Sequence, residues 1–447
     1  MKIICLAIWL FLGGNVSGQT LRELLKQAES NYPLLKAKTF EVLAGQRTVS
    51  AAKNTALPAL DAAYQIDYAT YNNITGMAST QFMVPMTGPP SPGNVYNGVF
   101  GSVAGLLLNW EPYTFGQRSA RIDIAKANLL YNKADAQQEI FAHQVRVINT
   151  YLDVLMANEL LKVYSRNVDR SSENLRVVRT LTVSGLRPGV DSALFSAELS
   201  RARVDKLTYS RFLETQQAGL AELLGSETLS DAADSSYFSS LPLFPSDTAS
   251  LIHPLVILST SKLEVNLHQR TYVQRSQYPK LTAWGTAYAR GSGIRYDGSV
   301  NSKEGFSFSR YNYGVGLQLS IPLLRFVDVR NQLHQQNALI GAQQERLNQV
   351  KLELNSQRIV ADLTLRNSLE IAKESPVFYQ SANFAFRSLL TRYNSGLANY
   401  ADLIQAQYGL VKAETDLKKS YVDCWKALLY EAAVQGDLNV FLTQVKE

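Results

Sequence analysis

The sequence predicts an α+β membrane protein in which a long α-helical coiled coil accompanies four transmembrane β-strands per chain. Four short stretches alternate apolar and polar residues and are flanked by prolines and aromatic residues, a pattern typical of strands in a membrane barrel. Two other stretches carry helical sequence for roughly 65 residues, or about 100 Å, which is too long for burial in one globular core. The last helical stretch spaces its apolar residues alternately by four and three positions, as in a coiled-coil seam.

The N-terminus has the pattern of a secretory signal peptide over residues 1–18. A charged start is followed by the apolar run 3–12 and by small residues up to Gly18, after which cleavage is expected. Of the 2 cysteines, Cys5 lies inside this run, so the exported chain keeps Cys424 alone and is expected to form no internal disulfide. We expect Cys424 to pack as a small apolar group. No later segment reaches ~18 uninterrupted apolar residues, so no transmembrane helix is predicted.

The remaining chain is predicted to be a tandem of two similar repeats, 19–225 and 251–447, joined by a linker at 226–250. Pro33 and Pro58 are matched by Pro254 and Pro279 about 220 residues later, and a Ser-Gly-Leu motif recurs about 210 residues later. Markers in the same order at nearly constant spacing indicate a duplication. The linker is rich in Ser, Asp and Pro and is expected to be a loop.

In the first repeat, a helix is expected over 37–56 and ends before Pro58, because proline cannot continue the helical hydrogen-bond ladder. Strands are expected over 60–71 and 95–110, separated by a long loop rich in Gly, Pro, Ser and Thr. Pro112 marks the junction with the following helix.

The second repeat follows the same plan, with strands over 281–290 and 311–321 around a Gly/Ser-rich loop. The last of these strands alternates most clearly and places Gly314, Gly316 and Ser320 on its polar face. Small and polar side chains on that face suit a water-filled interior.

Helices are then expected over 116–183 and 327–393. Ser375-Pro376 interrupts the second of these and predicts the N-cap and first-turn proline of a new helix. The C-terminal helix has eleven seam positions, of which nine are apolar: Leu397, Ala401, Ile404, Tyr408, Val411, Thr415, Lys418, Val422, Trp425, Leu429 and Ala432. The corresponding helix of the first repeat, from Leu186, follows this spacing less regularly.

The number of strands determines the assembly that a membrane location requires. Four strands cannot close a barrel, and unpaired strand edges are not tolerated in lipid. Two copies would supply eight strands and three copies twelve. An eight-stranded barrel fills with side chains, whereas twelve strands can leave a lumen, so we favour a trimer that closes a twelve-stranded β-barrel.

Together the signal peptide, the duplicated halves, the proline-introduced strand pairs and the paired Gly-Leu…Asp motifs resemble the TolC-like outer-membrane efflux protein family. The resemblance covers essentially the whole exported chain. It implies a homotrimer whose β-barrel contacts lipid in the outer membrane of a Gram-negative bacterium and whose α-helical barrel extends into the periplasm. It further implies an exit duct of a tripartite efflux or type I secretion system, with a periplasmic adaptor and an inner-membrane pump as partners.

The same resemblance assigns two kinds of site. The family's adaptor-docking helix-hairpin tips match two motifs of this sequence: Ser184, Gly185 and Leu186, and Ser395, Gly396 and Leu397. Glycine suits such a turn because it tolerates left-handed backbone angles. The family's periplasmic entrance constriction matches Asp191 and Asp402, and three copies of Asp402 would form an acidic ring that favours cations. Each aspartate could instead serve as a helix-start carboxylate facing the positive end of the helix dipole. A second acidic residue common in the family is replaced here by Gln405.

Enzyme and nucleic-acid functions find no support in the residue pattern. The 4 histidines are scattered, and no zinc, P-loop or nucleophile-elbow motif is present, so no catalytic residue, cofactor or metal site is predicted. The net charge of +6 comes from interspersed rather than clustered residues, which argues against nucleic-acid binding. The main alternative is a secreted or periplasmic coiled-coil scaffold or adhesin without a pore, which would have no reason for four alternating, aromatic-flanked segments.

Overall fold

The computed structural model describes residues 20–70, 93–94, 96–227, 234–245, 252–295 and 299–445. The expected signal peptide, most of the loop expected after the first strand and part of the linker lie outside these residues. The described chain divides into two compact units, each assembled from both halves of the sequence. Unit 1 comprises residues 1–43, 131–261 and 343–447, and unit 2 comprises residues 44–130 and 262–342.

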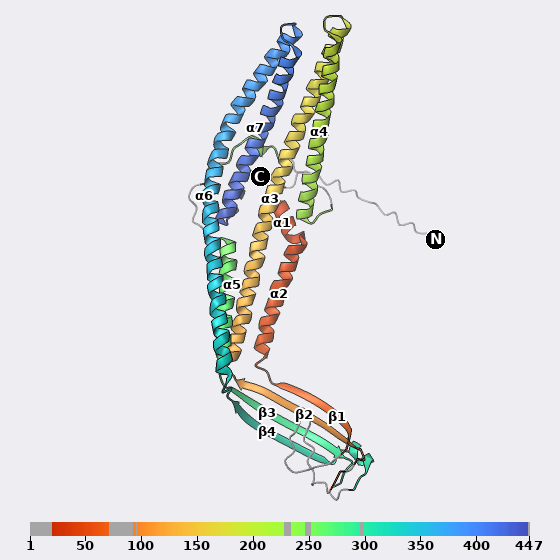
Figure 1. Ribbon diagram of the computed structural model, residues 1–447, viewed down its shortest axis with the longest axis vertical. Helices are drawn as coiled ribbons and strands as arrows, with labels where there is room; N and C mark the ends of the chain where they lie inside the picture. Colours follow the sequence, from red (N-terminus) through yellow and green to blue (C-terminus); the bar gives the residue numbers. More distant parts are fainter. Residues whose placement is uncertain are drawn as a thin grey trace, which may run out of the picture. The chain divides into compact units, whose positions relative to one another are not determined.

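Most described residues lie in helices, several of them very long (Figure 1). The elements other than strands are α1 (Leu21–Asn31), α2 (Pro33–Asn54), α3 (Gln117–Val183), α4 (Gly189–Leu224), η1 (Ser236–Phe238), α5 (Pro254–Arg275), η2 (Ser302–Phe306), α6 (Arg325–Asn394), α7 (Tyr400–Gln435) and α8 (Asn439–Leu442). In unit 1, α3 and α4 form one helix hairpin, and α6 and α7 form another. None of the described helices is long and apolar enough to cross a membrane.

Local sequence explains where several helices begin. Thr20 and Glu23 form a reciprocal capping box at the start of α1, which satisfies two backbone donors that the first turn leaves free. Pro33 occupies the first position of α2, where its missing N–H costs nothing. Asn399 caps α7 by accepting a hydrogen bond from the Asp402 backbone N–H at 2.8 Å.

The main core of unit 1, which we call the central core, draws side chains from both hairpins and from the short elements between them. Leu24 of α1, Leu152 of α3, Leu220 of α4 and Leu428 of α7 are all essentially inaccessible to solvent. The α7 seam contributes strongly: Val422, Trp425, Leu429 and Ala432 are buried, as the spacing predicted. Three seam positions are exposed in the single chain: Leu397, which lies in the turn before α7, and Ala401 and Tyr408 within it.

The prediction that a new helix starts at Ser375-Pro376 was wrong. Helix α6 runs without interruption from Arg325 to Asn394 with Pro376 inside it. A proline in a helix removes one hydrogen bond, and here the Ser375 hydroxyl donates a bond to the Ile371 carbonyl at 2.8 Å within the same turn. Ala372 is fully buried beside this turn, so packing keeps the helix continuous through the proline.

The expected loop between the repeats is anchored where the structure describes it. Tyr237, in η1, is buried and stands edge-on to Trp425, with ring centroids 5.0 Å apart. The Trp425 indole N–H donates to the carbonyl oxygens of Tyr237 and Ser240, at 3.1 and 3.3 Å. A long-range aromatic contact thus fixes a segment that has no helical periodicity of its own.

Among the described residues of unit 2, four strands form one antiparallel sheet in the order β1-β2-β3-β4. Their bounds are β1 (Ala59–Ala69), β2 (Val99–Tyr113), β3 (Lys280–Ser292) and β4 (Arg310–Ser320). All four predicted strands are confirmed within a few residues. Pro112 lies inside β2 rather than beyond it, at an irregularity between Trp110 and Tyr113 where the ladder can do without its N–H.

Candidate functional site

The sheet of unit 2 has two chemically different faces. Within the four strands, all of which the structure describes, every charged residue lies on one face: Asp61, Asp67, Glu111, Lys280, Arg290 and Arg310. We call this the charged face and its opposite the apolar face. The segregation follows from the register, because directly paired residues of neighbouring strands point to the same side.

The apolar face is broad and open to solvent in the single chain. Its rows combine leucine, alanine, valine and tyrosine, for example Leu60–Leu108–Gly285–Val315 and Ala62–Leu106–Ala287–Tyr313. Tyr313 is 88% exposed and Val315 80% exposed. A contiguous apolar surface of this extent indicates contact with a lipid or protein surface.

The charged face is less open at Gly314 and Gly316 than the sequence suggested. The Trp284 indole lies over both glycines, and a Cβ at Gly316 would come within 2.7 Å of its ring carbons. The small residues of β4 therefore make room for an aromatic side chain from the neighbouring strand. That this face borders a water-filled interior stays a prediction, and at Gly314 and Gly316 the Trp284 indole occupies part of that face.

The outer strands β1 and β4 each have one neighbour among the described residues, so each presents an unpaired edge. Nothing charged projects from the apolar face of these strands to discourage pairing. With four strands alternating in direction, β4 of one copy would meet β1 of a second copy in the antiparallel sense.

The two predicted tips, Ser184–Gly185–Leu186 and Ser395–Gly396–Leu397, are the turns of the two helix hairpins in unit 1 (Figure 1). Gly185 and Gly396 have φ values of +73° and +79°, as expected for tight turns that favour glycine. The Leu186 N–H donates to the Leu181 carbonyl at 2.9 Å, and the Leu397 N–H donates to the Arg392 carbonyl at 2.8 Å. Both turns are therefore Schellman caps of the same geometry.

All six tip residues are exposed, and the leucines most conspicuously so. Leu186 is 71% exposed and Leu397 is 70% exposed. Each turn thus presents one apolar side chain to solvent at the end of a rigid hairpin.

Just behind the tips, Tyr393 joins the two hairpins. Its hydroxyl donates a hydrogen bond to Asp191 Oδ2 at 3.0 Å, and its carbonyl accepts one from Arg187 Nη2 at 2.5 Å. The Arg187 guanidinium also lies over the Tyr393 ring, 4.3 Å from the centroid. Burial and the hydrogen bond to Asp191 raise the pKa of Tyr393 to about 12, so its hydroxyl remains a donor.

The two predicted constriction residues have different surroundings. Asp191 is buried and engaged by Tyr393, so in this chain its carboxylate links the hairpins. Asp402 is exposed in the first turn of α7 and is open to solvent or to other copies. The structure does not bring the carboxylates of Asp191 and Asp402 into contact with each other, and their role at an entrance stays a prediction.

Beyond Tyr393, a ladder of polar contacts connects the hairpins along α7. Tyr408 donates a hydrogen bond to Glu198 of α4 at 2.5 Å and accepts one from Arg201 at 3.1 Å. Gln407, which is fully buried, bonds to three side chains of α3: Asn174, Asn167 and Ser171, at 3.1, 3.2 and 2.9 Å.

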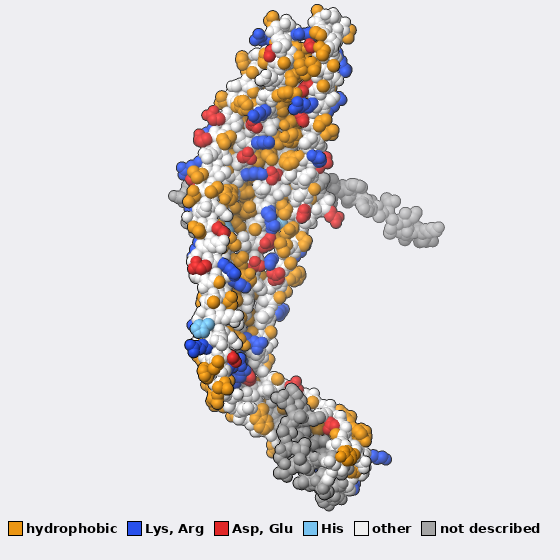
Figure 2. Space-filling model, in the orientation of Figure 1, with side chains coloured by type: hydrophobic (Ala, Val, Ile, Leu, Met, Phe, Trp, Pro, Cys, Tyr) orange, Lys and Arg blue, Asp and Glu red, His pale blue; other side chains and the backbone are white. Residues whose placement is uncertain are grey.

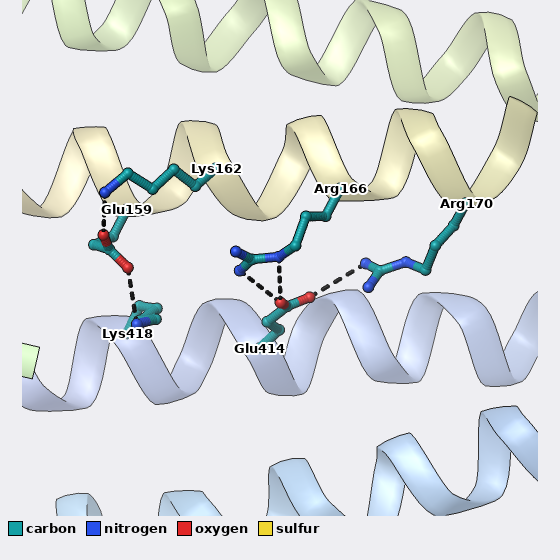
Figure 3. A network of polar contacts seen from close by, with 6 residues as sticks. All are labelled: Glu159, Lys162, Arg166, Arg170, Glu414 and Lys418. Carbon is teal, nitrogen blue, oxygen red and sulfur yellow. Dashed lines mark hydrogen bonds and ion pairs between the residues drawn. The ribbon is translucent and has the colours of Figure 1, made fainter. Parts of the chain in front are cut away.

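Two carboxylates, each between two cations, extend this ladder (Figure 3). Glu414 of α7 accepts from Arg166 Nη2 at 2.7 Å and from Arg170 Nη2 at 3.2 Å, both on α3. Glu159 of α3 pairs with Lys162 of the same helix at 2.7 Å and with Lys418 of α7 at 2.8 Å. The Glu414 side chain is only 7% exposed, so its partners compensate a substantial desolvation cost.

Sequence reasoning missed Gln407 and Glu414 because it searched α7 for apolar positions, and it missed Tyr393, at the end of α6, because the partner Asp191 lies about two hundred residues away. Lys418 offered a usable signal, because it is a charged residue at a seam position. Such a residue indicates that the neighbouring helix supplies a carboxylate, which here is Glu159. On the surface, Figure 2 shows acidic and basic side chains interspersed over the visible face of the helices, as the sequence indicated.

The structure also accounts for His143, His253 and Cys424. His143 is buried, stacks on Tyr32 at 4.0 Å and bonds to the Leu223 carbonyl at 3.0 Å, and His253 bonds to the Ala433 carbonyl at 3.1 Å. Cys424 is fully buried, and burial raises the pKa of its thiol to about 12, so it packs as predicted. Among the described residues, no group of three or more His, Cys, Asp or Glu could hold a metal ion.

Comparison with known proteins gives consistent matches along the chain. The model of the family described as outer membrane efflux protein matches residues 24–226 and 261–420. The nickel and cobalt resistance protein CnrC of Cupriavidus metallidurans is 25% identical over 249 residues, which is 56% of each chain. The match therefore spans little more than half of that relative's length. The cobalt-zinc-cadmium resistance protein CzcC of the same organism is 23% identical over 307 residues, 67% of this chain and 68% of the relative.

Solved structures share the fold over nearly the whole chain. The outer membrane protein VceC of Vibrio cholerae has a TM-score of 0.74 at 14% identity, covering 93% of this chain and 96% of that one. At this identity the likeness establishes the fold alone: long helices joined to a four-stranded antiparallel sheet.

Proposed function

Because the chain belongs to the outer membrane efflux protein family, we propose that it is the outer-membrane exit channel of a tripartite efflux or type I secretion system. In this role it passively conducts solutes that an inner-membrane pump and a periplasmic adaptor deliver. The family is one of transport proteins, and energy for transport comes from the pump.

One observation supports this proposal most strongly: all charged residues of the four strands share one face, and the opposite face is apolar and exposed. A strand that faces lipid on one side and a water-filled lumen on the other needs this segregation. A pore-free scaffold or adhesin offers no reason for it.

The unpaired edges of β1 and β4 support assembly into a homotrimer. In lipid, each backbone group on these edges would lack a hydrogen-bond partner, which costs several kcal/mol per group. Three copies joined edge to edge supply twelve strands in alternating directions and close the barrel without a free edge.

A matched pair of variants on β4 tests the proposal. Val315→Arg places a charge on the apolar face, which costs about 2–4 kcal/mol near the middle of a bilayer, whereas Gln318→Arg places the same charge on the charged face of the same strand. We expect wild type and Gln318→Arg to fractionate with outer membranes as heat-dissociable trimers that conduct in planar bilayers. Val315→Arg should lose the trimer band. A wild-type protein that is monomeric, or absent from the outer-membrane fraction, would refute the channel.

The exposed tips of the two helix hairpins are proposed to dock the periplasmic adaptor, with Leu186 and Leu397 as the apolar contacts. Three copies of Asp402 are proposed to form an acidic ring at the periplasmic entrance. Asp191 is proposed to act there indirectly, by holding the two hairpins together through Tyr393.

The cargo is proposed to be chosen by the pump, because a wide, water-filled barrel discriminates weakly between small solutes. Relatives named for resistance to nickel, cobalt, zinc and cadmium make metal ions one class to test first. Co-expression with the adaptor and pump of the same operon, followed by metal and drug tolerance assays, would identify the cargo.

A further inference from the structure

Two arginines lie side by side on the charged face of the sheet. Arg290 of β3 and Arg310 of β4 are direct partners in the antiparallel register, so their side chains project from neighbouring positions on the same side. They lie near the end of the sheet where β3 ends and β4 begins, which we call the loop end. Arg310 is exposed and Arg290 is half-buried.

Neither guanidinium has an ion-pair partner among the residues that the structure describes. Arg310 donates a hydrogen bond to the carbonyl of its neighbour Ser309 at 2.9 Å. The nearby carboxylate of Asp67 accepts a hydrogen bond from Gln65 at 2.8 Å and lies over Gly101 of β2. Strand β2 is two strands away from β4, or about 10 Å, so Asp67 does not neutralise Arg310; β2 is adjacent to β3, but Asp67 forms no ion pair with Arg290 either.

Other cationic side chains of this unit do form ion pairs. Lys280, at the other end of the charged face, pairs with Glu111 at 3.4 Å, and Arg295, in the segment after β3, pairs with Glu304. Arg290 and Arg310 thus stand out as a like-charged pair without a counter-charge in the described chain. Like charges placed directly opposite each other destabilise a sheet, so the pair is not explained by the stability of the strands.

We propose that Arg290 and Arg310 attract anionic solutes to the lumen, as a ring of guanidiniums near the loop end of the closed barrel. This inference rests on the proposed channel, because the charged face lines a lumen only when three copies close the barrel. The paired planar guanidiniums suit carboxylate and phosphate groups, which they can bind in a bidentate manner. Rings of arginine are one of the means by which pores favour anions.

The size of the effect follows from Coulomb's law. Two positive charges about 7 Å from a permeating ion in water, half screened at ~0.1 M salt, change its local concentration about two- to threefold. The same potential lowers the local concentration of potassium by that factor, so the ratio of chloride to potassium permeability should fall about four- to ninefold in the double variant Arg290→Gln/Arg310→Gln. The charge-preserving variant Arg290→Lys/Arg310→Lys is the matched control and should keep the wild-type ratio.

The experiment measures the reversal potential of single channels of the full chain in a KCl gradient. Inorganic phosphate added to the solution then serves as the anionic probe, and it should reduce current through wild type more than through the glutamine variant. An unchanged reversal potential in Arg290→Gln/Arg310→Gln channels would overturn the arginine ring and leave the channel intact. Failure of wild type itself to form trimers and conduct would overturn the channel and the ring with it.

Discussion

Replacing Gln407 with leucine is expected to loosen the attachment of α7 to α3. Gln407 is fully buried and makes three hydrogen bonds, to Asn174, Asn167 and Ser171, which are themselves 8%, 3% and 1% exposed. Leucine has a similar volume but no polar atoms, so the substitution leaves buried donors and acceptors without partners. Each lost bond of this kind costs about 1 kcal/mol, or more where the remaining group stays desolvated. The expected loss is therefore ~3 kcal/mol of local opening free energy.

Native-state amide hydrogen exchange provides the assay, because it reports the opening of one helix rather than the unfolding of the whole chain. A loss of ~3 kcal/mol corresponds to exchange about a hundredfold faster, since every 1.4 kcal/mol is a factor of ten. The amides to follow are those of the buried face of α7 around Leu410. The control is Gln405→Leu, an identical substitution two residues away at an exposed position.

Exchange in Gln405→Leu should stay within about twofold of wild type, because exposed substitutions change stability little. If Gln407→Leu and Gln405→Leu exchanged at the same rate, the buried polar network would not contribute to holding the hairpins together. The attachment of α7 to α3 would then have to come from the apolar contacts of the surrounding helices.

Three further outcomes are expected. Asp402→Ala should raise single-channel conductance or lower cation preference in planar bilayers, and unchanged values of both would remove the acidic ring. Gly396→Arg should weaken cross-linking to the adaptor, because the side chain occupies the tip and a non-glycine residue at φ +79° costs roughly 1–3 kcal/mol of strain; wild-type cross-linking would contradict docking at this turn. Burial lowers the pKa of His143, and Arg146 lowers it further, while Glu139 and Glu29 raise it. Because the net effect is a lowered pKa in the folded chain, His143 takes up a proton on unfolding at acidic pH. The stability that neutral His143 provides is present above pH ~6.5 and declines as the pH falls, by at most about 1.4 kcal/mol at pH 5.5. The urea midpoint should therefore fall less between pH 7.5 and 5.5 in His143→Gln than in wild type. The control is His334→Gln, at an exposed position, which should behave like wild type.

The sheet could be predicted from sequence because its determinants are local. A strand with two different faces must alternate its residues, and prolines mark its ends, so the segment from Tyr311 onward identified β4 without knowledge of its partners. The tips were predictable for a similar reason, since a glycine with positive φ ends a helix by contacts within six residues.

The remaining errors concern long-range packing. Pro376 predicted a helix break that the buried Ala372 turn prevents, and nothing near residue 237 in the sequence indicated that Tyr237 would anchor on Trp425. The link between Tyr393 and Asp191 spans about two hundred residues and leaves no periodic signal. A polar residue inside a helix interface depends on hydrogen-bond partners that are distant in the sequence. A search for periodic apolar positions therefore detects such a residue only as an interruption of the pattern.

The polar ladder divides the apolar interior of unit 1 into two parts with different consequences for the tips. The central core surrounds residues such as Leu152 and Leu428, and a smaller cluster near the tips contains Phe195, Phe386 and Leu403. Along α7, Gln407 lies inside the tip cluster, which extends to Leu410, and Glu414 lies between the two clusters; their contacts with α3 are hydrogen bonds and ion pairs. Such contacts depend on geometry, so a small shift of one helix breaks them, whereas apolar contacts slide with little loss. We therefore propose that the tip cluster opens without disturbing the central core, as an entrance made of helix hairpins would require.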